Sequence, residues 1–201
     1  AAAFSFNESG GTVAADTSGN GNTGTLHGGT FAAGRNGNAL TLNGSSDYME
    51  APNSASLDIA GTGLTLAFWV KINPTSRTEP YLIVDKPWNP TTIGYPYYQY
   101  GVAYSNCCTR TLDLYFGDSG GTMHGPHRIN PTQGVWTHAA YTYDGSTVTG
   151  YLDGVQVLSA TDIGNLQARG NSLRLGVGAA YAEFFNGALD DLRIYSRALT
   201  Q

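Results

Sequence analysis

Short segments with the apolar–polar alternation of a β-strand recur along this chain, and helical periodicity is nearly absent. The clearest segment is 64–72, where every second residue from Leu64 to Ile72 is apolar and would lie on one face. Similar segments are 38–43, 48–51, 81–84, 98–104, 112–116, 136–143, 148–152, 155–158, 173–177 and 188–195. Asp144-Gly145 and Asp153-Gly154 favour hairpin turns. So many strands predict an all-β chain, a two-sheet antiparallel β-sandwich of the jelly-roll type.

Length and charge narrow the class of protein. The 201 residues fit one domain spanning 1–201, and 41% hydrophobic residues can fill the interior of two layers. The net charge is −5 and there is no basic stripe, so nucleic acid and anionic membrane are poor partners. No stretch reaches the roughly 18 apolar residues of a membrane helix. Ala1-Ala2-Ala3 resembles a mature end left by signal-peptide cleavage, so we expect a secreted, extracellular protein.

The two cysteines, Cys107 and Cys108, are adjacent. They cannot join distant strands. In an oxidising compartment they could form a vicinal disulfide that fixes a tight turn. Two reduced thiols on a loop, or pairing with another molecule, are the alternatives.

Oxygen-bearing side chains alternate near the N-terminus, at Asp16, Ser18, Asn20 and Asn22. Alternate oxygens on a tight loop are how a chain wraps a hard cation such as Ca²⁺. His27 stands where an EF-hand loop has its closing glutamate, so a calcium ion would need a carboxylate from elsewhere in the fold. A polar Gly/Asn turn without metal is the alternative.

The motifs of the whole chain, taken in order, resemble the laminin-G-like jelly-roll family within the concanavalin-A-like lectin/glucanase superfamily. They include Asp16-x-Ser-Gly-Asn-Gly-Asn22, Leu66-x-Phe-Trp-Val-Lys71, Tyr151-Leu-Asp-Gly154 and Phe185-Asn-Gly-x-Leu-Asp-Asp-Leu-Arg-Ile-Tyr195. The resemblance implies two curved antiparallel sheets and a glycan held on the concave sheet. It also implies a structural Ca²⁺ whose ligands, carried over by position, would be Asp16, Asn20, Asn22 and Asp190.

Residues 86–130 are longer and more aromatic than the family pattern requires, which makes this segment the candidate ligand site. Its first part, 86–96, holds three prolines and is not expected to form a central strand. Flat Trp and Tyr faces suit the C–H side of a sugar ring, and Asn, Arg and His suit its hydroxyls. The candidate ligand-binding residues are Trp88, Tyr95, Tyr98, Tyr100, Asn106, Arg110, His124 and His127. Tyr98, Tyr100 and Tyr104 alternate, so all three could project into one groove, or else into the core.

These residues favour a non-catalytic carbohydrate-binding module or lectin-like domain that recognises a poly- or oligosaccharide and is fused to a catalytic partner. The paired acids Glu-x-Asp-x-x-Glu of retaining hydrolases are absent from the sequence. One alternative is a polysaccharide lyase acting on a uronate-containing glycan, with Tyr98 or Tyr100 and His124 or His127 as the base and acid. A second alternative is an adhesion or protein-binding domain. Arg110 and the histidines would suit a uronate carboxylate or a sulfate.

Overall fold

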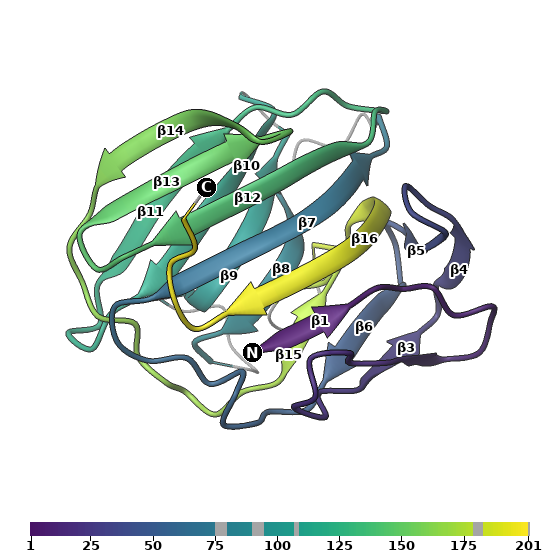
Figure 1. Ribbon diagram of the computed structural model, residues 1–201, viewed down its shortest axis with the longest axis horizontal. Coiled ribbons are helices and arrows are strands. Elements are labelled where there is room, and N and C mark those ends of the chain that lie inside the picture. The colour runs from purple at the N-terminus through teal and green to yellow at the C-terminus, as the bar shows by residue number, and fades with distance from the viewer. Residues whose placement is uncertain (75–79, 90–94, 107–108, 179–182, 201) are drawn as a thin grey trace.

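Two antiparallel sheets stack face to face in the computed structural model, which describes residues 1–74, 80–89, 95–106, 109–178 and 183–200. The described strands of the first sheet, in spatial order, are β14 (Val155–Thr161), β13 (Thr147–Leu152), β12 (Thr137–Tyr143), β7 (Leu64–Ile72), β16 (Asn186–Tyr195), β5 (Asn38–Asn43) and β4 (Thr30–Ala33), with β1 (Ala2–Phe4) also paired to β16. Figure 1 shows this sheet in front of the second.

The second sheet also has eight described strands. In spatial order they are β11 (Met123–Ile129), β10 (Thr111–Gly117), β9 (Tyr98–Ser105), β8 (Tyr81–Pro87), β15 (Leu173–Leu175), β6 (Tyr48–Ala51), β3 (Gly24–His27) and β2 (Val13–Ala14). The fold is therefore the predicted two-sheet sandwich. Among the described residues no helix is long and apolar enough to cross a lipid bilayer.

The core lies between the inner faces of the two sheets. On β7 the alternating apolar residues from Leu64 to Ile72 are all buried, as predicted. Tyr141 of β12 crosses the core, and its hydroxyl donates a 2.5 Å hydrogen bond to the carbonyl oxygen of Leu112 on β10. This bond ties one sheet to the other through a side chain that is almost completely buried.

The hairpin at Asp153-Gly154 also agrees with the sequence, since both residues have positive φ, 49° and 81°. The sequence did not predict β11, because Gly125 and Pro126 interrupt its pattern. Proline is tolerated there because β11 is the edge strand of its sheet. The expectation that 86–96 holds no central strand is wrong at its start, because Lys86 and Pro87 end β8.

We predict that Tyr141→Phe lowers the free energy of unfolding by about 1–2 kcal/mol, because the Leu112 carbonyl loses a buried donor. Urea unfolding of the variant and the wild type measures the difference. Tyr151→Phe is the matched control, because Tyr151 is half-buried on the outer face of the first sheet and should change stability little. Equal losses in the two variants would contradict the role given to the Tyr141 hydroxyl.

Candidate functional site

A row of paired residues crosses the outer face of the second sheet. Glu50 pairs with Arg174, Arg174 with Asp85, Asp85 with Gly101, and Gly101 with Tyr115. Directly opposite residues on neighbouring strands point to the same side of a sheet. The sequence neighbours of these residues are in the core, so the row lies on the opposite, outer face. We call Glu50, Arg174 and Asp85 the polar row.

Tyrosine rings continue this face from Gly101 outwards. The Tyr98 ring covers Gly101, where an added Cβ would come within 3.2 Å of Tyr98 Cδ1. Ring centroids are 5.3 Å apart for Tyr98 and Tyr115, 6.2 Å for Tyr97 and Tyr98, and 6.2 Å for Tyr95 and Tyr97. Tyr95 and Tyr97 are 61% and 40% exposed. These four tyrosines, the tyrosine row, present aromatic surface to solvent.

Trp88 flanks the tyrosine row. Its backbone N–H donates to the Tyr97 carbonyl oxygen at 3.0 Å, and its ring lies against Gly117, where an added Cβ would come within 2.7 Å of it. The Arg169 guanidinium carbon lies 3.9 Å from the centre of the Trp88 ring, a cation–π contact. Trp88, Tyr95 and Tyr98, all predicted as ligand-binding residues, are thus brought together on one side of the sandwich.

Carboxyl groups dominate the charge beneath this face. Asp85 is completely buried, and neither of its oxygens accepts a hydrogen bond from the described residues. Burial raises the pKa of Asp85 to about 8, although the Arg174 cation acts in the opposite direction. Arg174 Nε lies 3.6 Å from Glu50, and Arg128 Nε lies 3.6 Å from the buried Asp113. Each of these two cations therefore already faces an acid.

The expectation that Tyr100 and Tyr104 share a groove with Tyr98 is wrong. Both are completely buried in the core, and the Tyr100 hydroxyl donates to the Leu57 carbonyl oxygen at 2.8 Å. The reason is a register shift: Tyr98 pairs with Pro87 and Tyr100 with the preceding Lys86. The extra residue between the two tyrosines is a β-bulge, which places them on opposite faces.

The two histidines lie on the core side of the sheet, away from the tyrosine row. His124 stacks on the buried Phe116 ring at 4.7 Å. His124 Nδ1 contacts one carboxylate oxygen of Asp162, and His127 Nε2 lies 2.8 Å from the other. His124 Nε2 is 3.2 Å from Asp118. The described contacts therefore join these histidines to acids, and do not join them to Tyr98 or Tyr100 as the lyase hypothesis requires.

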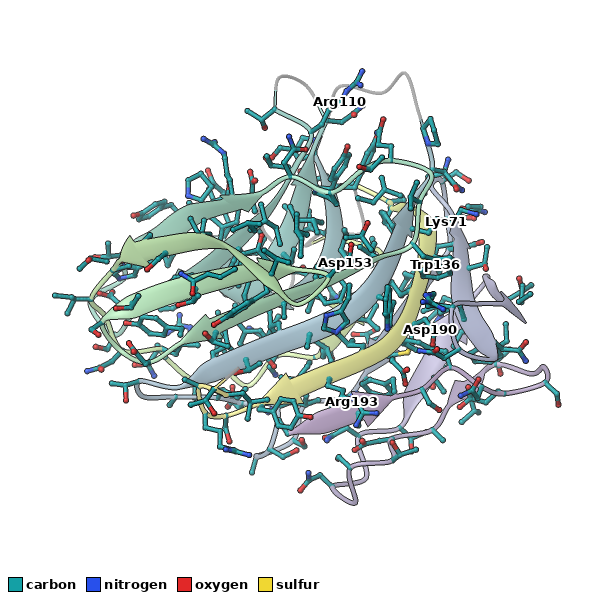
Figure 2. The ribbon with its side chains drawn as sticks, turned by 45° about the horizontal axis from the view of Figure 1, so that its top comes forward. Lys71, Arg110, Trp136, Asp153, Asp190 and Arg193 are labelled. Carbon is teal, nitrogen blue, oxygen red and sulfur yellow. The ribbon has the colours of Figure 1, made fainter. Side chains whose placement is uncertain are left out.

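Asn106 and Arg110 lie beyond the other end of β9 from Tyr98. The Gln133 amide donates to Asn106 Oδ1 at 3.3 Å. Figure 2 shows Arg110 at one end of the molecule. The residues predicted as a single ligand site thus divide into three places. The predicted disulfide, Cys107–Cys108, lies outside the described residues.

The Asp16 loop is held by hydrogen bonds within the protein. The Asp16 carboxylate accepts from the backbone N–H groups of Ala3, Ser18 and Asn22 at 2.8–2.9 Å. The amide nitrogens of Asn20 and Asn22 both donate to the Ala1 carbonyl oxygen, at 2.9 and 2.8 Å. Burial acts to raise the pKa of Asp16, but these backbone hydrogen bonds outweigh it and lower the pKa.

Asp190 does not join this loop in the described contacts. Its Oδ2 accepts from the backbone N–H groups of Arg35 and Asn36 at 2.9 and 2.8 Å. In the part of the chain that the structure describes, no group of three or more His, Cys, Asp or Glu residues is arranged to hold a metal ion. The described hydrogen bonds thus hold Asp16, Asn20 and Asn22 in one loop and Asp190 against the turn at 35–36, and a calcium ion shared by the four stays a prediction.

Two stacked antiparallel sheets with an aromatic outer face define a lectin-like β-sandwich. Residues 43–201 match the Laminin_G_3 family, described as the concanavalin A-like lectin/glucanases superfamily, and the chain belongs to this family. Among curated protein sequences, none matches the chain.

Solved structures share the fold. Domain 4 of AbnA, a GH43 extracellular arabinanase from Geobacillus stearothermophilus, was solved in complex with arabinotriose; it has 24% identity and a TM-score of 0.71, over 99% of this chain and 93% of that one. The binding domain of botulinum neurotoxin serotype G has 15% identity and a TM-score of 0.73, over 99% of this chain and 48% of that one. The binding domain of Paraclostridial Mosquitocidal Protein 1 has 15% identity and a TM-score of 0.72, over 97% and 50%. The chain therefore spans about half the length of these two toxin domains.

We predict that Asp16→Ala lowers the free energy of unfolding by about 2 kcal/mol, because it removes the acceptor of several backbone hydrogen bonds. The loss should be the same in buffer with calcium and in buffer with a chelator, as measured by denaturant unfolding. A loss that occurs only when calcium is present would instead support the predicted metal site.

We predict that His124 makes stability depend on pH. Burial acts to lower its pKa, but hydrogen bonds to Asp162 and Asp118 outweigh burial and raise the pKa above its ordinary value. A raised pKa means that the charged form stabilises the fold at pH values below about 6.5, the ordinary value, and that this contribution is lost as pH rises through the folded-state pKa. Burial lowers the pKa of the neighbouring His127, which acts in the opposite direction.

The measurement is the difference in unfolding free energy between the wild type and His124→Gln across a pH series from acidic to mildly alkaline buffer. Subtracting the variant largely removes the contribution of His127. The difference should be largest at the acidic end and shrink as pH rises. A constant difference would show that His124 contributes by packing alone.

Proposed function

We propose that this chain is an extracellular carbohydrate-binding domain that holds a neutral oligosaccharide over the tyrosine row. The observation that carries the proposal is the series of ring contacts from Tyr95 through Tyr97 and Tyr98 to Tyr115, on an outer sheet face. Exposed aromatic surface is unfavourable in water unless a ligand covers it, and the C–H faces of sugar rings are suited to cover it.

The charges under this face favour a neutral ligand over an acidic one. Arg174 faces Glu50 and Asp85, and Arg128 faces Asp113. Arg169 lies over the Trp88 ring. An anionic sugar would have to compete with these carboxylates for the arginines, whereas hydroxyl groups can donate to carboxylates and accept from guanidinium groups.

The shared fold with domain 4 of an extracellular arabinanase, solved with arabinotriose, supports the choice of a short neutral oligosaccharide as the ligand and an extracellular setting. A catalytic partner domain stays a prediction, and so does an adhesion role. The lyase alternative gains no support, because a base and an acid must reach the same sugar unit and the described histidines lie on the core side of the sheet.

We predict that Tyr98→Ala and Tyr115→Ala each weaken arabinotriose binding about tenfold, because each removes an aromatic face worth roughly 1–1.5 kcal/mol. Isothermal titration calorimetry gives the affinities, and a galacturonic acid trimer of the same length should bind more weakly than arabinotriose. Tyr151→Ala is the matched control, because this tyrosine lies on the other sheet. Equal affinity of the wild type and both site variants would overturn the proposal.

A further inference from the structure

A polar pocket lies at the end of the sandwich away from the tyrosine row, and the function proposed above does not use it. It has a volume of about 510 Å³ and is lined by Pro74, Arg110, Asn130, Pro131, Thr132 and Gln133. Pockets of a few hundred Å³ are the size that small ligands occupy. These residues follow β7, β9 and β11 in the chain, so three connections meet here.

The lining of this pocket differs in charge from the tyrosine row. Of the described residues that line it, Arg110 alone carries a charge, and none is a carboxylate. Asn130 and Gln133 add two planar amides and Thr132 adds a hydroxyl. A guanidinium group suits a carboxylate because two parallel N–H donors can meet its two oxygens, and amides suit hydroxyl groups because they both donate and accept.

Arg110 has an unusual backbone conformation, and Gln133 has an oriented side chain. Arg110 has a φ of 53°, in the left-handed region that a residue with a long side chain rarely adopts. Such a conformation is strained and is found most often at functional sites. Gln133 is oriented by its 3.3 Å hydrogen bond to Asn106 Oδ1.

A buried tyrosine lies next to this lining. Tyr104 is completely buried and is not one of the residues that line the pocket. Burial raises the pKa of Tyr104, while the neighbouring Gln133 side chain and the Arg110 cation act to lower it. The hydroxyl therefore lies on the side of the core that faces Gln133 and Arg110.

We propose that this pocket binds an acidic sugar residue of the hexuronate class. Arg110 takes the carboxylate, and Asn130 and Gln133 take ring hydroxyls. The proposal does not rest on the tyrosine row, because the two places lie at opposite ends of β9 and share no residue.

Titration of ¹⁵N-labelled protein with sodium D-glucuronate tests the proposal. We expect backbone amide shifts that saturate at Asn130, Thr132 and Gln133, with Arg110→Gln weakening the affinity at least about tenfold because the carboxylate loses its charged partner. Gln133→Ala should weaken it a few-fold, because a ring hydroxyl loses its amide partner. Arg193→Gln is the matched control, since Arg193 is half exposed on the first sheet and lies far from Arg110 in Figure 2.

Titrations with D-glucose and with sodium acetate test separately whether the site requires the carboxylate and whether it requires the sugar ring. Neither should shift the amides of Asn130, Thr132 and Gln133 at the concentrations at which glucuronate saturates them. Acetate binding as tightly as glucuronate would show a site for any carboxylate and overturn the assignment to a sugar. Unchanged affinity in Arg110→Gln, or shifts confined to the tyrosine row, would overturn the site itself. Arabinotriose binding would be unaffected in both cases, so failure here is distinguishable from failure of the tyrosine row.

Discussion

The register of β9 against β8 is the constraint on which both the core and the ligand face depend. Because one extra residue stands between Tyr98 and Tyr100, the strand sends Tyr98 outwards and Tyr100 inwards. A regular strand would place both rings on the same side. The core would then lose the hydrogen bond from Tyr100 to Leu57, or the outer face would lose the ring that joins Tyr97 to Tyr115.

The same register explains why a glycine stands at position 101. Gly101 lies opposite Asp85 on one side and Tyr115 on the other, in the middle of the outer face. The Tyr98 ring needs the space above it, and an added Cβ would also lie 2.9 Å from the Val84 carbonyl oxygen. Gly117 has the same relation to Trp88. Two glycines on neighbouring strands thus make room for two aromatic rings on this face, and Arg169 lies over the Trp88 ring in turn.

The sequence predicted the layers of this fold better than the positions of its site residues. The alternation in 64–72 is strict, so both the strand and its buried face were predicted correctly. The bulge at Gln99 has no such signal, because polar and aromatic residues fit either face, and Tyr100 was therefore assigned to the wrong face. Asp190 shows a different limit, because a motif fixes only the order of residues along the chain, so its part in a shared calcium ion stays a prediction. In the fold, Asp190 accepts hydrogen bonds from the turn at Arg35 and Asn36.

The two ends of β9 differ in charge because different residues surround them. Tyr98 lies at the end where the neighbouring strands carry Asp85 and the acids near it, beneath aromatic rings. Beyond the other end, the turn holds Arg110 with amides and prolines around it, and no described residue of the pocket lining is an acid. An anionic group approaching the first end meets carboxylates that already neutralise the arginines, whereas at the second end it meets a guanidinium group that no described lining residue neutralises. One hairpin, β9–β10, therefore connects two surfaces that differ in charge, and under the two proposals above a polysaccharide with both neutral and acidic units would have a place for each.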